Sequence, residues 1–321
     1  MNVFLTFDIE VWCNGWGNLD NAFPSSFERY VYGRSAHGDY ALPQILAILN
    51  QHGLKGVFFV EPLFATRFGA EHLETIVQLI RGAGQEIQLH LHTEWSDEAR
   101  QPIIKNNSSK RQHLNHYTLD EQTTLIGHGK KMLEDAGSGS ICAFRAGSYA
   151  VNRDTFTALS RNQIYLDSSL NSCFAVSGPD MRSSFDFTKA ILLDGVTVRP
   201  ATVMTDGFGN DRPIQVGACS FEEIRDALVS AKLAKRRDFT IVSHNFEMLK
   251  QGSSEPDWVV VKRFMRLCAF LAQHPEKFVV RGFANDLRQE SGSSEAQQQP
   301  SATWHATTKR YAEQFARRMV R

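Results

Sequence analysis

The sequence lacks several features that mark specialised classes of protein. Its 35 basic and 35 acidic side chains leave no formal net charge, so we expect no nucleic-acid partner for the main body. No apolar run approaches the roughly 20 residues that are needed to cross a bilayer. The first residues lack the basic region and the long apolar core of a signal peptide. These absences together predict a cytoplasmic globular protein.

Cysteine is also scarce. The five cysteines are odd in number and form no Cys-x-x-Cys pair (Cys13, Cys142, Cys173, Cys219 and Cys268). Such a set is typical of reduced thiols, and it predicts neither a disulfide framework nor a zinc knuckle.

The sequence does contain a regular alternation of apolar strands with amphipathic helices. The main predicted strands are residues 2–8, 54–60, 141–145, 164–167 and 239–244, and the main predicted helices are 40–52, 70–81, 118–136, 152–161, 220–236 and 257–273. Thr118 and Glu121 have the spacing of a capping box, and Ser220 with Glu223 repeats it. Because the strands are too apolar to have a solvent face, the alternation indicates an α/β fold with a covered parallel sheet.

A further short strand is predicted within residues 84–95, and it carries an unusual set of polar side chains. Successive side chains of a strand alternate between its faces, so His90 and His92 lie on the same face. If the strand continues by one step, Glu94 joins them and three metal ligands converge beside Trp95. The alternative for the two histidines alone is a half-exposed pair at a strand edge.

Similar polar residues follow other predicted strands. They are Asp8 and Glu10, Arg145, Asp167 and His244. The carboxyl ends of the strands carry the active site in α/β barrels. Polar residues at the ends of five strands are hard to explain as core packing, so the sequence predicts a site there. The long polar stretch that runs to about residue 38 predicts a loop that borders this site.

Five stretches resemble, in the same order, the motifs of the polysaccharide deacetylase family (NodB homology domain, carbohydrate esterase family 4). They are Thr6–Glu10, Gly84–Glu94, Phe144–Tyr149, Tyr165–Ser169 and Ile241–His244. The resemblance covers residues 1–285 and implies a distorted (β/α)7 barrel that forms a single domain. The linker-like composition of 286–302 and the basic segment 303–321 predict a flexible connection and a C-terminal helix.

The resemblance also implies roles for the residues at the strand ends. It implies one divalent metal ion, with zinc the first choice and manganese, cobalt, nickel or iron as alternatives. Glu10 and His90 match two of the family's ligands. Glu94 falls where the family has a second histidine, and His92 is the alternative third ligand.

The catalytic roles follow from the same motifs. Asp8 matches the general base, Arg145 the residue that orients it, and His244 the general acid. Tyr149 and Trp95 are the expected substrate-binding aromatics, with core packing as the alternative for a single aromatic residue. Asp167 is expected to bind the substrate or orient His244, and a capping aspartate fits its position equally well.

These expectations add up to a metal-dependent deacetylase. The expected substrate is an N-acylated sugar or a lipid-linked saccharide precursor in surface-polysaccharide or lipopolysaccharide biosynthesis. One alternative is a catalytically silent barrel that binds a glycan or a protein partner, because Glu94 and a missing proline depart from the motifs. The other alternative is an amidase that acts on a small non-sugar amide.

The C-terminal segment has a character of its own. Tyr311, Phe315 and Met319 recur every four residues and so share one face of a helix, for which Thr307 or Thr308 would be the cap. Five basic residues against one acidic residue give this segment a positive charge (Lys309, Arg310, Arg317, Arg318 and Arg321 against Glu313). Such a helix predicts peripheral contact with the inner face of the membrane. The alternative is a tail helix that docks on its own barrel.

Overall fold

The computed structural model describes residues 1–105, 109–174, 188–284 and 298–319. The chain divides into two compact units that are each assembled from separated stretches. The first unit consists of Met1–Gly56, Ala201–Arg281 and Gln297–Arg321, and the second of Val57–Pro200 and Gly282–Ala296.

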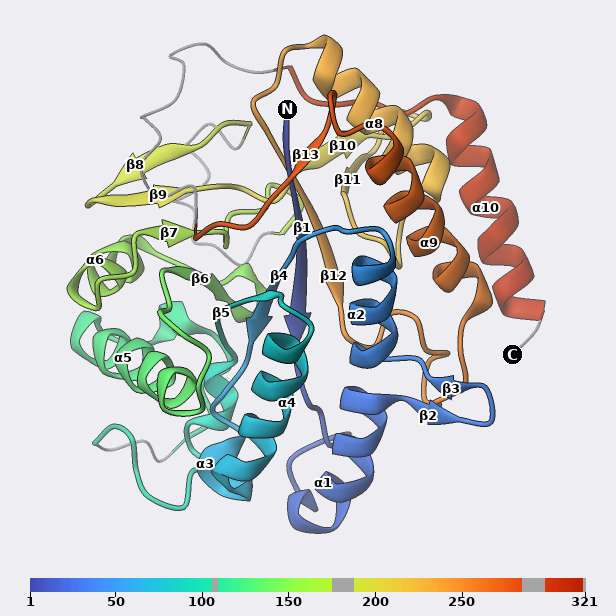
Figure 1. Ribbon diagram of the computed structural model, residues 1–321. Coiled ribbons are helices and arrows are strands. Elements are labelled where there is room, and N and C mark those ends of the chain that lie inside the picture. The colour runs from blue at the N-terminus through green and yellow to red at the C-terminus, as the bar shows by residue number, and fades with distance from the viewer. Residues whose placement is uncertain (106–108, 175–187, 285–297, 320–321) are drawn as a thin grey trace. The chain divides into compact units, whose positions relative to one another are not determined.

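The first unit is built on β1 (Asn2–Ile9), whose side chains are buried from Val3 onward. In Figure 1, β1 runs beside β12 (Asp238–His244), and the two strands pair in parallel. The short strand β13 (Val279–Val280) pairs with β1 as well. Buried side chains on both faces of β1 require helices or loops on both sides, as in parallel α/β sheets.

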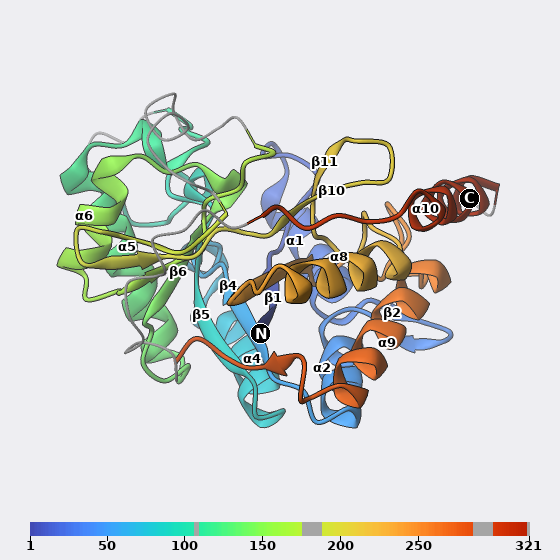
Figure 2. The same ribbon diagram turned by 90° about the horizontal axis from the view of Figure 1, so that it is seen from above.

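Among its described residues the first unit also contains five α-helices and two small hairpins. The helices are α1 (Leu19–Phe27), α2 (Leu42–Gln51), α8 (Phe221–Leu233), α9 (Trp258–Gln273) and α10 (Trp304–Met319). The hairpins are β2–β3 (Arg34–Ser35 and Gly38–Asp39) and β10–β11 (Val203–Thr205 and Asp211–Pro213). Figure 1 and Figure 2 show α10 beside α8, with which it packs.

The second unit contains the remaining described strands. Its parallel strands follow the order β4 (Gly56–Val60), β5 (Glu86–Leu91), β6 (Ala143–Ala146), β7 (Leu166–Asp167) and β9 (Val196–Val198), and β8 (Ile191–Leu193) pairs antiparallel with β9. Its α-helices are α3 (Ala65–Phe68), α4 (Ala70–Gly82), α5 (Leu119–Asp135) and α6 (Arg153–Arg161). Both α4 and α5 pack on β5, which carries the two histidines.

Two local predictions are confirmed. Both capping boxes form, at Thr118 with Glu121 and at Ser220 with Glu223. In the structure all five cysteines are free thiols. Within the described residues no helix is long and apolar enough to cross a membrane.

Other predictions need correction. The stretch before residue 38 is not a plain loop, because it contains α1, a π-helical turn at Glu28–Tyr32 and the β2–β3 hairpin. The C-terminal helix is not capped by Thr307 or Thr308, which lie inside it. Instead Thr303 Oγ1 accepts a hydrogen bond from the Ala306 N–H. Most of the predicted linker lies outside the described residues.

Candidate active site

The ends of β1 and β12 bring three titratable side chains of the first unit together. The strand register places Asp8 opposite His244. The His244 Nε2 atom lies 4.0 Å from Asp8 Oδ2. One ligand atom each from Asp8, Glu10 and His244 lies within 4.8 Å of the others. This cluster can move a proton between a carboxylate and an imidazole, and its oxygen and nitrogen atoms are of the kind that bind a divalent ion.

Glu247 fixes the orientation of His244. The Nδ1 atom of His244 donates to Glu247 Oε1 at 2.8 Å, which turns Nε2 toward Asp8. Three further donors hold the same carboxylate: Gln215 Nε2 at 2.6 Å, the Gly217 N–H at 2.6 Å and Ser243 Oγ at 3.1 Å. Glu247 was not among the residues predicted from the sequence, although its spacing of three residues from His244 was a usable signal.

The surrounding carboxylates change the acidity of His244. Burial alone would lower the pKa of the imidazole. The hydrogen bond to Glu247 and the negative charges of Glu10, Glu247 and Asp8 outweigh burial and raise the pKa to about 9. His244 is therefore protonated at neutral pH, which is the state that a general acid requires.

Glu10 is held by its neighbours at both its side chain and its backbone. Trp12 Nε1 donates to Glu10 Oε2 at 2.6 Å. Asn245, which is fully buried, accepts from the Glu10 N–H and donates to the Glu10 carbonyl, at 3.2 and 3.0 Å. The rings of Trp12 and Trp16 lie edge to face at 6.2 Å, and both are partly exposed. A partly exposed aromatic surface thus lies beside the carboxylates.

In the second unit the two histidines of β5 lie together, with ring centroids 4.8 Å apart. The His90 Nδ1–H donates to the Arg145 carbonyl at 2.8 Å. This bond fixes the tautomer and leaves the lone pair on Nε2, as is usual for a metal-binding histidine. β5 ends at Leu91, and Thr93–Trp95 forms a 3-10 turn, so the strand does not continue to Glu94.

Glu94 contacts His92 directly. Its Oε1 atom accepts from His92 Nδ1 at 3.2 Å, which leaves Nε2 of His92 as the second nitrogen able to bind an ion. The Oε2 atom of Glu94 is buried and has no hydrogen-bond partner among the described residues. A carboxylate that accepts from the far nitrogen of a histidine is a common partner of a metal ligand. The geometry therefore favours His92, our alternative third ligand, with Glu94 orienting it.

A further buried carboxyl group, Glu61, lies in the same unit. It accepts hydrogen bonds from the backbone N–H groups of Leu63 and Phe64. Burial raises its pKa to about 8, although these bonds and the charge of His92 act against the shift. Glu61 was not among the predicted site residues, yet it directly follows the predicted strand 54–60, as Asp8 ends the strand 2–8.

Arg145 and Asp167 are both fully buried in the second unit. Arg145 donates through Nε and Nη2 to the carbonyl and hydroxyl oxygens of Ser168, both at 3.1 Å, and its guanidinium lies 4.3 Å from the centre of the Phe59 ring. Asp167 accepts from Ser169 Oγ at 2.6 Å and from the Ser169 N–H at 2.9 Å. This geometry favours the capping role for Asp167 over contact with a substrate.

The two predicted substrate-binding aromatics have different surroundings. Tyr149 is partly exposed and lies 4.9 Å from the Phe174 ring. Ser148 and Tyr149 have φ angles of +55° and +57°, and such strained backbone in residues other than glycine is concentrated at functional sites. Trp95, in contrast, is buried against Phe68, so its expected role is corrected to core packing.

Comparison with known proteins identifies the fold. No protein-family model and no curated protein sequence matches the chain. Among solved structures, a Mycobacterium smegmatis protein assigned to the polysaccharide deacetylases matches with a TM-score of 0.55 and 17% identity, over 92% of this chain and 94% of that one. The chain has the polysaccharide deacetylase fold. The 4-alpha-glucanotransferase from Thermococcus litoralis also matches, with a TM-score of 0.58 and 11% identity, over 91% of this chain and 40% of that one.

The polysaccharide deacetylase fold confirms the fold class that the motifs implied. The roles of the individual residues are a separate matter, because structural similarity at this level of identity establishes the fold alone. The predicted ligands Glu10 and His90 belong to different units, and their joint role stays a prediction.

Proposed function

We propose that this protein is a metal-dependent amide hydrolase that removes an acyl group, such as acetyl, from an N-acylated sugar. The observation that carries the proposal is the arrangement of Asp8, His244 and Glu247 in the first unit. A buried carboxylate faces one nitrogen of an imidazole, and a second carboxylate holds the other nitrogen. Amide hydrolysis needs one group that accepts a proton from water and another that donates one to the departing amine.

Asp8 is the proton acceptor in this proposal. It is buried at the end of β1, and water is the group from which it would remove a proton. His244 is the proton donor, because its raised pKa keeps Nε2 protonated at neutral pH. Glu247 contributes by orienting the ring and by stabilising its positive charge.

The donor atoms of this chain fit a divalent ion. Glu10, His90 and His92 are our proposed ligands, and each has a partner that orients it: Trp12 for Glu10, the Arg145 carbonyl for His90, and Glu94 for His92. When bound, the ion supplies Lewis-acid polarisation of the acyl carbonyl. One carboxylate and two neutral histidines leave the ligand shell of a divalent ion positive, which strengthens that effect.

A carbohydrate substrate is supported by two independent points. The two solved structures described above have names that refer to carbohydrate chemistry, a polysaccharide deacetylase and a glucanotransferase. In addition, Trp12 and Trp16 offer partly exposed aromatic rings beside Glu10. We keep a precursor of surface-polysaccharide or lipopolysaccharide synthesis as the proposed substrate class.

The experiment that tests the proposal is an assay of acyl release on a panel of amides. Protein loaded with zinc, manganese or cobalt is incubated with N-acetylated sugars, with their de-N-acetylated forms and with small non-sugar amides, and released acetate and new amines are measured. Acetate released from N-acetyl sugars alone supports the proposal. Release from small amides alone supports the amidase alternative, and stoichiometric metal without any release supports a silent barrel.

The matched variant for this assay is Asp8→Asn, which keeps the size of the side chain and removes its basicity. We expect kcat/KM to fall at least about a hundredfold. Metal content, measured by elemental analysis, should stay nearly unchanged because Asp8 is not among the proposed ligands. An active Asp8→Asn enzyme would refute the role of Asp8.

A further inference from the structure

The C-terminal helix α10 docks on the first unit through its charged side chains. Arg310 is buried, and it donates to Glu223 Oε1 at 2.9 Å and to Asp206 Oδ2 at 3.1 Å. Thr307 on the same face donates to Glu223 at 2.9 Å. The predicted alternative of a docked tail helix therefore describes one face of α10.

The second half of the helix is attached in the same way. Glu313 accepts from Arg263 of α9 at 2.8 Å, and Arg317 donates to Asp257 at 2.6 Å. Arg263 and Arg317 also both donate to the Gly217 carbonyl. Arg310 and Arg317 are two of the basic residues on which the prediction of membrane contact was based. Both form ion pairs within the first unit.

The opposite face of α10 is apolar and exposed. We call it the outer face of α10 and define it by Trp304, Tyr311, Phe315 and Met319, which are 57%, 49%, 66% and 71% exposed. The spacing of seven, four and four residues places them along one side of the helix. Phe208 from the β10–β11 turn is 56% exposed and extends this surface, because its ring lies 6.0 Å from that of Tyr311.

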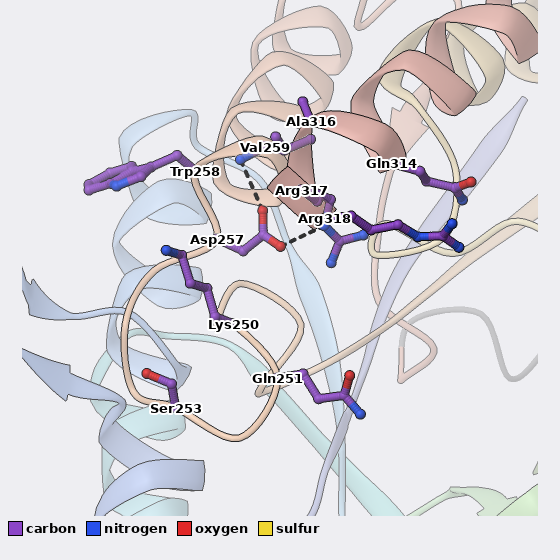
Figure 3. Close-up of a pocket in the computed structure, with 10 residues that line it drawn as sticks. All are labelled: Lys250, Gln251, Ser253, Asp257, Trp258, Val259, Gln314, Ala316, Arg317 and Arg318. Atoms are coloured by element: carbon purple, nitrogen blue, oxygen red, sulfur yellow. Dashed lines mark hydrogen bonds and ion pairs between the residues drawn. The ribbon is translucent and has the colours of Figure 1, made fainter. Parts of the chain in front are cut away.

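A basic pocket of about 870 Å³ adjoins the C-terminal end of this helix. Figure 3 shows the Arg317–Asp257 pair in the middle of its lining, with Lys250 on one side and Arg318 on the other. Three basic side chains, Lys250, Arg317 and Arg318, and one acidic side chain, Asp257, line the pocket, so the formal charge of its lining is positive. Arg318 follows Phe315 by three residues and so also borders the outer face of α10.

We propose that the outer face of α10 and this pocket together bind the surface of an anionic lipid bilayer. Tryptophan, tyrosine and phenylalanine are side chains that lie at the boundary between lipid headgroups and acyl chains. Lys250 and Arg318 beside them attract anionic headgroups, and the pocket offers space for one. The aromatic side chains supply the apolar contact and the basic residues supply the preference for charge.

A second copy of the chain fits this surface less well than lipid does. The described part of α10 exposes two charged side chains, Lys309 and Arg318, and both are basic. Lys309 pairs with Glu222 of α8 at 3.6 Å, so the charge that a second copy would meet is mainly that of Arg318. Pairing two outer faces would bring like charges together, whereas an anionic surface is complementary to them. The proposal is independent of the proposed activity, since it concerns binding alone.

Cosedimentation of the full-length protein with lipid vesicles tests the proposal. We expect binding to phosphatidylcholine vesicles that contain phosphatidylglycerol, little binding to phosphatidylcholine alone, and weaker binding as salt is raised. Phe315→Ser should reduce partitioning about tenfold, and Arg318→Gln about fivefold on the anionic vesicles only. Both side chains are exposed, so neither change should alter the melting temperature.

Two control variants complete the design. Leu192→Ser removes an exposed apolar side chain from β8, and Lys131→Gln removes an exposed basic side chain from α5. Both should bind like the unaltered protein. The proposal is overturned if the protein stays in the supernatant with anionic vesicles at low salt, or if the control variants weaken binding as much as Phe315→Ser and Arg318→Gln. It is also overturned if sedimentation velocity shows a dimer that Phe315→Ser dissociates, because a second copy would then cover the face.

Discussion

At the scale of single residues, Glu247 determines the behaviour of His244. Glu247→Gln keeps the size of the side chain and removes the charge that raises the pKa of the imidazole. A general acid works while it is protonated, so a lower pKa ends its working range at a lower pH. We expect the alkaline limb of the kcat profile to move to lower pH in this variant. The pH dependence of kcat, with the imidazole titration followed by NMR, measures the shift.

The control for Glu247→Gln is Ser243→Ala. It removes a neutral donor to the same carboxylate, 3.1 Å from Glu247 Oε2, and leaves the charge in place. Its alkaline limb should stay close to that of the unaltered enzyme. An unmoved limb in Glu247→Gln would mean that Glu247 has a structural role only.

A second prediction separates His92 from Glu94. His92→Ala should remove a ligand and abolish tight metal binding. Glu94→Gln keeps an oxygen that can accept from His92 Nδ1, so it should weaken metal affinity only about tenfold. Elemental analysis after equilibrium dialysis measures both. The reverse order of effects would make Glu94 the ligand and His92 its neighbour.

The residues that the sequence could predict share one property. Asp8, Glu10 and His244 directly end or follow strands, and strand ends can be recognised from the apolar pattern alone. Glu247 and Asn245 act through hydrogen bonds whose donors and acceptors come from distant parts of the chain, such as Gln215 and Tyr30. Contacts with such distant partners cannot be read from a local pattern. The three-residue spacing of Glu247 from His244 was the local signal that this pair offered.

At the scale of elements, Arg310 fastens α10 to the unit. Arg310→Met removes one partner of a buried ion pair and leaves Glu223 and Asp206 without their counter-charge. Changes of this kind cost about 3–5 kcal/mol of the free energy of unfolding. We expect a loss of that order in urea denaturation. Arg318→Met in the same helix is the control and should stay within about 0.5 kcal/mol, because Arg318 is exposed.

The elements differ in how far the sequence could predict them. Capping boxes are local, and both formed where their spacing indicated. Helix α1 was missed because Pro24 lies inside it, and proline normally ends a helix. For α10 the apolar stripe was predicted correctly, but periodicity cannot tell which face docks. Here Glu223 and Asp206, far away in the sequence, bind the charged face.

At the scale of the whole molecule, alternation of strands and helices was enough to predict the fold class. It was not enough to predict the two units, because each combines stretches that are far apart in the sequence. The first unit unites the N-terminal strand with residues after 200, through pairing of β1 with β12. Such long-range pairing depends on packing between segments, which local patterns do not contain.

Two buried carboxyl groups give the stability of the protein a distinctive dependence on pH. Burial raises the pKa of Asp167 from 3.8 to about 6 and that of Glu61 from 4.5 to about 8. A raised pKa in the folded state means that the ionised group destabilises the fold. The contribution of each group to the free energy of unfolding is therefore fully present below the pKa that the group has in the unfolded state. That contribution is lost as the pH rises through the pKa that the group has in the folded state.

Asp167→Asn tests this sign directly, because the variant cannot ionise at that position. The quantity to compare is the free energy of unfolding of the variant minus that of the unaltered protein. This difference should increase by on the order of 2–3 kcal/mol from pH 4 to pH 6 and stay level above pH 6. Urea denaturation at a series of pH values gives this difference. Asp120→Asn, at a side chain that is 92% exposed, is the control and should give a nearly flat difference. A difference for Asp167→Asn that falls with rising pH would mean that Ser169 and Arg145 hold the carboxylate ionised in spite of burial.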